Sequence, residues 1–190
     1  MNQKVDREAV TNSFHKILGR RFLAYLLDWY IGAMLTALPI GIVSQKLYGT
    51  MLNQNLLSFT KPYGLICGIL SLLCSLIYYV VIPLGKNKGQ TLGKKLLHLK
   101  IIKENGEDVD FKTIFIRQVI GIILIEGGLY TASVIWQQVI ELTLDIPVVT
   151  FLKFLGLGLS ILSALLLAFH KNHKSIHDYI AKTTVVDIKD

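Results

Sequence analysis

The stretch from Arg20 to Val43, RRFLAYLLDWYIGAMLTALPIGIV, is apolar over a length that can cross a bilayer. It opens on two arginines and contains one carboxylate, Asp28, in its apolar interior. An ionised carboxylate at that depth costs roughly 3 kcal/mol or more, so Asp28 requires a partner or water. Arg21 lies seven residues earlier on nearly the same helical face, but about 10 Å away along the axis. The two side chains therefore share a face without touching.

The rest of the composition agrees with a membrane protein. The chain has 190 residues, of which 52% are apolar and 17% charged, and its mean hydropathy is +0.51. The apolar segments predict four spans in one domain that covers residues 1–190. These spans are residues 22–43, 64–84, 114–136 and 147–169.

The distribution of lysine and arginine sets the expected topology. Five precede the first span, two lie in the first loop, seven in loop 85–113, none in the third loop and four in tail 170–190. By the positive-inside rule, both termini, loop 85–113 and the tail are expected on the cytoplasmic side of the membrane. Because the charges follow the spans in this way, the net charge of +7 does not indicate a nucleic-acid partner.

Two polar segments have strand patterns. The sequence LHLKIIKENGEDVDF alternates apolar and polar residues around an Asn105-Gly106 turn signal, and TTVVDI near the C-terminus resembles a third strand. The predicted fold class is therefore an all-α membrane protein with four transmembrane helices, both termini cytoplasmic, and a small cytoplasmic β-hairpin or three-stranded sheet.

Three further charged residues lie inside the predicted spans. With straight helices, Arg117 lies at the depth of Asp28, and Glu126 lies at the depth of Lys153. We expect two ion pairs, Asp28 with Arg117 and Glu126 with Lys153. They either line a polar transport path or simply hold the bundle together.

Small residues recur along the second and fourth spans and favour close helix contacts, within the chain or between copies. The two sets are Gly64, Gly68, Ser71 and Ser75, and Gly156, Ser160, Ala164 and Ala168.

Four short motifs resemble the RDD family of bacterial membrane proteins, named for one arginine and two aspartates. Arg21 and Asp28 match its first helix; Thr91, Gly93 and Lys94 match its T-x-G-K-x-L segment; Arg117 matches the arginine of the next helix; and Asp178 in HDYIAKTTVV matches the second aspartate. Lys182 replaces the usual glycine of the last motif, His98 stands where glycine is common, and Gln118 replaces asparagine. The resemblance implies the membrane architecture, and transport of ions or small ligands is a proposal made for the family.

The remaining motifs argue against other chemistry. His170, His173 and His177 share a face if the fourth helix continues, which is compatible with metal binding, but a basic juxtamembrane anchor is the favoured interpretation. The run GKNKGQTLGKK lacks the spacing of a phosphate loop, and no nucleophile-base motif is recognised. We therefore expect no metal, no cofactor and no enzyme activity.

Two functions remain open. The first is a transporter in which Asp28 binds a proton or cation beside Arg117. The second is a non-transporting accessory or regulatory protein that docks a partner through its cytoplasmic hairpin and tail. Expected partners are the lipid bilayer and either a second copy or another membrane protein, and nucleic acid is not expected.

Overall fold

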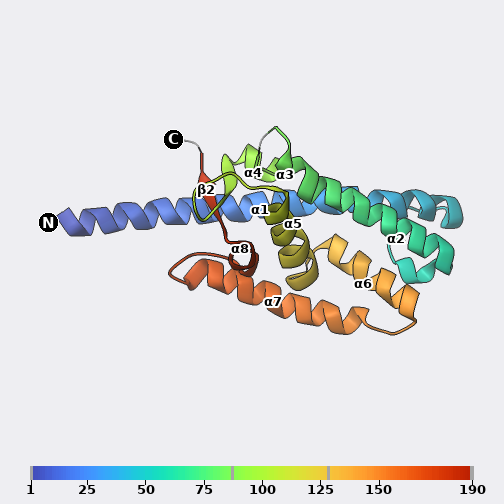
Figure 1. Cartoon of the computed structure of the whole chain (residues 1–190). Helices are drawn as coiled ribbons and strands as arrows, with labels where there is room; N and C mark the ends of the chain where they lie inside the picture. Colours follow the sequence, from blue (N-terminus) through green and yellow to red (C-terminus); the bar gives the residue numbers. More distant parts are fainter. Residues whose placement is uncertain (1, 87, 128, 189–190) are drawn as a thin grey trace.

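Long helices dominate the computed structural model, which describes residues 2–86, 88–127 and 129–188 and their side chains from residue 17 onward. Helix α1 (Asn2–Tyr48) is followed by α2 (Lys61–Leu76), which continues through the π-helical η2 (Ile77–Val81) into α3 (Ile82–Leu84). Helix α7 (Val149–Phe169) runs beside them (Figure 1). Within the described residues, three stretches are long and apolar enough to cross a membrane: Ile17–Tyr48, Lys61–Leu84 and Val149–Phe169.

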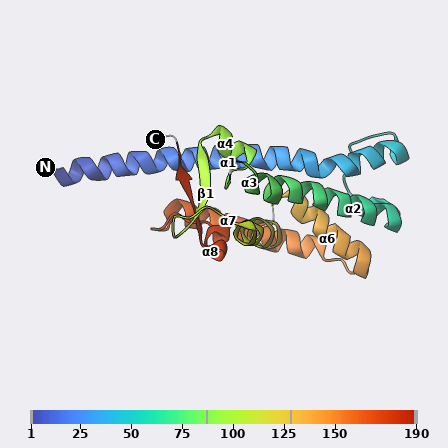
Figure 2. The same ribbon diagram turned by 45° about the horizontal axis from the view of Figure 1, so that its top comes forward.

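The expected third span, 114–136, is not one helix. Helix α5 (Phe111–Phe115) continues as the π-helical η3 (Ile116–Ile125), and a separate α6 (Thr131–Leu144) follows. The pair α5 and η3 lies across the long axis of α1 and α2, and it is viewed nearly end-on when the molecule is turned (Figures 1 and 2). The predicted continuous helix and the predicted loop 137–146 are therefore wrong. Helix α6, with 14 residues, is about 21 Å long, shorter than a ~30 Å hydrocarbon core.

Side chains of α6 stabilise this break. Ser133 Oγ and Trp136 Nε1 both donate to the carbonyl of Ile123, at 2.8 and 3.0 Å. Backbone groups freed by an interrupted helix need such partners when no water is near. We call the described residues between η3 and α6, 126–127 and 129–130, the elbow.

The small sheet is formed by β1 (Leu99–Lys103) and β2 (Thr183–Asp187), which pair antiparallel with Leu99 opposite Asp187. The strand expected in TTVVDI is thus confirmed. The expected hairpin around Asn105-Gly106 reduces to a single bridge between Ile102 and Asp108. His98 and Lys182, the residues that replace glycine, both adopt positive φ, 56° and 51°. The tight turn before β2 is therefore made without glycine.

The small-residue stripe of α2 is used inside the chain. Gly64, Gly68, Ser71 and Ser75 are all buried. A Cβ on Gly68 would lie 2.4 Å from Val139 Cγ2 of α6, so this face holds α6 rather than a second copy. On α7, Gly156 is buried but Ala164 is exposed, so that stripe is only partly covered.

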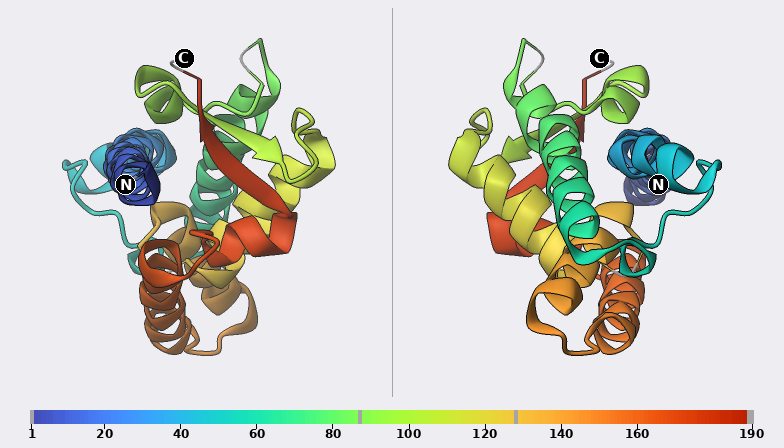
Figure 3. Two further views of the ribbon diagram at one scale, coloured as in Figure 1. Left: turned by 90° about the vertical axis from the view of Figure 1, so that its left-hand side faces the viewer. Right: turned by 90° about the vertical axis from the view of Figure 1, so that its right-hand side faces the viewer.

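The short helix α4 (Leu92–Leu96), the sheet and α8 (Ile176–Ala181) gather at one end of the bundle. They lie beside α1 on the side of its N-terminal half, and β2 ends there (Figures 1 and 3). We call this the sheet end. The short η1 (Leu56–Ser58) and the connection between α6 and α7 lie at the opposite end.

Candidate functional site: two buried aspartates

Asp28 accepts four hydrogen bonds at the sheet end. Its Oδ1 accepts from Tyr78 Oη at 2.7 Å and from the backbone N–H of Gly93 at 2.9 Å. Its Oδ2 accepts from the hydroxyl of Thr91 and from Lys94 Nζ, the latter at 2.9 Å. The carboxylate side chain is 4% exposed, and one cation neutralises it.

The segment TLGK reaches Asp28 because α4 starts against α1. Thr91 precedes the first turn of α4, so its hydroxyl and the N–H of Gly93 point at the carboxylate, as helix N-termini do toward anions. A Cβ on Gly93 would lie 2.6 Å from the carbonyl oxygen of Ala24 and 2.8 Å from Asp28 Oδ1. Only glycine at this position allows the backbone to come so close.

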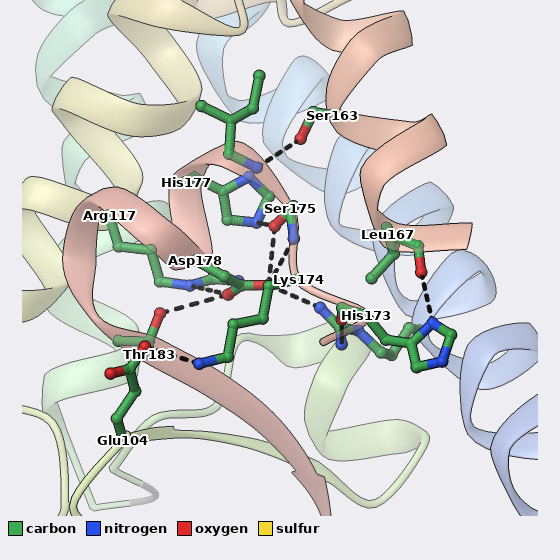
Figure 4. Close-up of polar contacts among 12 residues, drawn as sticks. Glu104, Arg117, Ser163, Leu167, His173, Lys174, Ser175, His177, Asp178 and Thr183 are labelled. Carbon is green, nitrogen blue, oxygen red and sulfur yellow. Dashed lines mark hydrogen bonds and ion pairs between the residues drawn. The ribbon is translucent and has the colours of Figure 1, made fainter. Parts of the chain in front are cut away.

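Asp178 forms a second cluster, drawn in Figure 4. Arg117 donates to its Oδ1 from Nε at 3.2 Å and from Nη2 at 2.8 Å, and Arg21 Nη2 donates to Oδ2 at 2.8 Å. Ser175 Oγ adds a bond at 2.7 Å and Thr183 Oγ1 one at 3.3 Å. The side chains of Asp178 and Arg117 are 0% and 2% exposed. One carboxylate therefore joins α1, η3 and α8.

Local sequence explains the position of Asp178. Ser175 and Asp178 form a capping box at the N-terminus of α8, so the cap of its own helix holds the carboxylate in addition to the arginines. Burial opposes ionisation of Asp178, but the charges of Arg117, His177 and Arg21 outweigh burial and hold its pKa well below its usual range.

His177 links the second cluster to the elbow. Its backbone N–H donates to Glu126 Oε1 at 2.6 Å, and its Nδ1 lies 2.9 Å from the same oxygen. On its other side, Nε2 lies 2.8 Å from Ser175 Oγ. Burial, and then the charge of Arg117, lower the pKa of His177, although Glu126 and Asp178 oppose this.

The motif residues now have a common explanation. The RDD family model matches residues 17–182, which includes both clusters. The chain belongs to the RDD family. Its helices identify it as a membrane protein in contact with the lipid bilayer. Comparison with curated proteins and with solved structures gives no match.

In this RDD protein, the five residues that match the motifs besides the aspartates each contact one of the two aspartates. Thr91, Gly93 and Lys94 surround Asp28, whereas Arg21 and Arg117 surround Asp178. Both π-helical stretches contribute, Tyr78 from η2 and Arg117 from η3, in agreement with the frequent occurrence of π-bulges at functional sites.

Both expected ion pairs are wrong. Arg117 pairs with Asp178 and Asp28 pairs with Lys94. The depth of Arg117 was calculated for a straight third span, whereas η3 lies crosswise. Glu126 bonds to His177, while Lys153 is exposed and has no ion pair within the described part of the chain.

The three histidines do not lie on one face. Helix α7 ends at Phe169, so the chain turns at His170 and the expected continuation of the helix is wrong. His170 Nδ1 lies 3.0 Å from Tyr179 Oη, the carbonyl of His173 accepts from Arg21, and His177 meets Glu126. Among the residues described, no group of three or more His, Cys, Asp or Glu side chains is placed to hold a metal.

Several members of the clusters were not predicted from the sequence. Tyr78, Ser175, Thr183 and His177 each contact one of the two aspartates or Glu126. The Ser-x-x-Asp spacing from Ser175 to Asp178 was an available signal, since it is typical of a helix cap. Tyr78 had none, because no spacing or neighbouring charge distinguishes it from the adjacent Tyr79 in the apolar run.

Proposed function

We propose that this RDD protein is a non-enzymatic transporter of protons or small cations, with the Asp28 carboxylate as the binding group. The observation that carries this proposal is the contact between Asp28 Oδ2 and Lys94 Nζ at 2.9 Å. Lys94 occupies the position that a bound cation would take, next to the oxygens of Asp28 and Thr91. Carboxylate and hydroxyl oxygens are suitable ligands for hard cations.

The Lys94 side chain supports an exchangeable site. At 15% exposed it is the more accessible of the two charged groups in the cluster, and among the described residues it bonds, besides Asp28, only to Thr91, at 3.4 Å. A lysine is a compact charge on a flexible stem and is displaced more readily than a forked arginine. Release of Lys94 by an incoming cation would leave Asp28 with three neutral donors.

The proposal includes an orientation. The lysine-rich loop 85–113 lies at the sheet end, so by the positive-inside rule this end, with both termini, faces the cytoplasm of a bacterial cell. Asp28 then lies in the inner half of the membrane, where a charged group commonly marks an ion pathway.

Flux into reconstituted vesicles tests the proposal. Asp28→Asn keeps the size of the side chain but removes its charge, and we expect it to abolish proton or cation flux. Asp145→Asn is the matched control, because Asp145 pairs with Lys61 at an exposed site far from Asp28. Unaltered flux in Asp28→Asn would remove Asp28 from the mechanism.

A second candidate function is a docking module. This candidate is supported by the arrangement at the sheet end. Contacts of the two aspartates hold the sheet, α4 and α8 against the long helices, so that these elements form one surface. Exposed Lys95 and Lys112 lie at this end, so Lys95→Glu with Lys112→Glu changes the surface without touching either cluster. A partner that is retained in mild detergent and lost in this variant, together with absent flux in the wild type, would favour docking.

A further inference from the structure

Helix α5 carries two phenylalanine rings on its outer surface. Phe111 and Phe115 are 62% and 37% exposed, and their rings stack with centroids 5.7 Å apart. Lys112 is exposed next to them, whereas Ile114, on the other side of the ring pair, is fully buried. At about 100° of rotation per residue, Phe111, Phe115 and Lys112 form one continuous face. The outer face of α5 therefore combines two aromatic rings with a cation.

The neighbours of α5 place this face at the edge of the hydrocarbon core. Helix α5 packs against α3, which ends the membrane-length stretch Lys61–Leu84. Because α5 and η3 lie across α1 and α2, α5 runs along this edge rather than through the core (Figure 2). Exposed phenylalanine beside lysine is typical of a helix in the interfacial region, where rings contact acyl chains and lysines reach headgroups.

The charges around α5 leave lysine in excess. Each carboxylate of the preceding loop, residues 107–110, is paired with a lysine: Glu107 and Asp110 with Lys103, and Asp108 with Lys100. By contrast, Lys86 and Lys112 are exposed and have no ion pair in the described part of the chain. Lys86 follows the last residue of α3 by two positions, and α3 packs against α5. Two unpaired cations therefore lie where the second membrane-length stretch ends.

We propose that Lys86, Lys112 and the ring pair of Phe111 and Phe115 form a binding site for an acidic phospholipid. The lysines contact the headgroup phosphate, and the rings contact the first part of the acyl chains. Charge complementarity determines the occupant, because two unpaired lysines at headgroup level favour an anion and the adjacent rings favour one that carries acyl chains. This site lies outside both aspartate clusters and does not depend on transport through Asp28.

Native mass spectrometry of the full chain in detergent tests the proposal. The probes are dioleoylphosphatidylglycerol, which is acidic, and dioleoylphosphatidylcholine, which has the same acyl chains and no net charge. We expect the wild type to retain the acidic lipid about tenfold more strongly, since each lysine near an acidic headgroup strengthens binding about fivefold. Lys86→Gln with Lys112→Gln should remove this preference. Phe111→Ser with Phe115→Ser should weaken both lipids alike, because both have the same chains.

Lys46→Gln with Lys153→Gln is the matched control. Both lysines are exposed and lie toward the opposite end of the bundle, so this variant has the same net charge as the first and an intact site. It should keep the preference of the wild type. An equal loss in the two variants would mean that net charge alone attracts the lipid, and this would overturn the proposal. An unaltered preference in Lys86→Gln with Lys112→Gln, or no preference in the wild type, would also overturn it.

Thermal unfolding in lipid-free detergent separates lipid binding from stability. Lys86 and Lys112 have no ion pair in the described part of the chain, so the variant that lacks both should unfold at the same midpoint as the wild type. A clearly lower midpoint would mean that the two lysines are bonded within the protein rather than free for a headgroup. That result would overturn the proposal as well.

Discussion

The two buried aspartates at the sheet end are neutralised by different means. Asp178 contacts two arginines from two different elements and is fixed by the cap of its own helix. Asp28 contacts one lysine and three neutral donors. Arginine presents a rigid fork that holds a carboxylate in one geometry, whereas lysine is a mobile point charge. Asp178 is therefore held between structural elements by two arginines, whereas in the proposed function Asp28 is the carboxylate that exchanges its cation.

Asp178→Asn is expected to lower the free energy of unfolding the most. The change leaves Arg21 and Arg117 without their carboxylate, and Arg117 is 2% exposed and cannot reach water. Breaking a buried ion pair from one side costs about 3 to 5 kcal/mol. We expect a correspondingly lower free energy of unfolding, measured by denaturant titration in detergent.

Asp28→Asn sharpens the comparison. Its amide can still accept from Tyr78 and Gly93, and the released Lys94 is partly exposed, so the cost should be clearly smaller, about 1 to 3 kcal/mol. If the two variants are equally destabilised, the distinction between a fixed and an exchangeable aspartate does not hold.

Gly93→Ala tests the close approach of α4 to α1. Its Cβ would overlap the carbonyl oxygen of Ala24 and Asp28 Oδ1, so α4 must shift and the Gly93 N–H bond is lost. Overpacking of this kind costs about 1 to 3 kcal/mol. Gly19→Ala is the control, because its Cβ meets nothing within 4 Å, and it should be neutral or slightly stabilising. Thermal unfolding of the two variants side by side measures the difference.

The smallest expected effect is on the pH dependence of the free energy of unfolding, through His177 beside the second cluster. The pKa of His177 is lowered in the folded protein, so below about pH 6.5 the unfolded state binds more protons and folding loses stability. The contribution of His177 to stability is fully present above about pH 6.5 and is lost as the pH falls toward the pKa of His177 in the folded protein. The wild type should therefore lose more stability between pH 7 and 5 than His177→Gln. Parallel pH profiles of unfolding in the two proteins test this, and identical slopes would contradict it.

The sequence predicts the long helices and the C-terminal strand, but it does not predict which charged side chains pair with each other. Membrane-length apolar runs identify α1, α2 and α7, because every backbone group in lipid must be bonded within its own helix. The strand near the C-terminus was also recognisable from its alternation, and β2 confirms it. These features depend on local sequence alone.

The ion pairs required information that local sequence does not contain. Arg117 was assigned to Asp28 by a depth calculation that is valid only for a straight third span. The break at the elbow turns η3 crosswise, which brings Arg117 to Asp178. The motif T-x-G-K was recognised, but nothing in its spacing shows that Lys94 contacts the first helix.

A set of double-mutant cycles tests the central claim, that the two aspartates have separate cations. The pairs are Asp28 with Lys94, Asp178 with Arg117, and Asp28 with Arg117, each measured as free energies of unfolding in the same detergent. We predict clear coupling for the first two pairs, about 1 kcal/mol or more, and additivity for the third. Coupling between Asp28 and Arg117, with additivity for Asp28 and Lys94, would contradict this assignment.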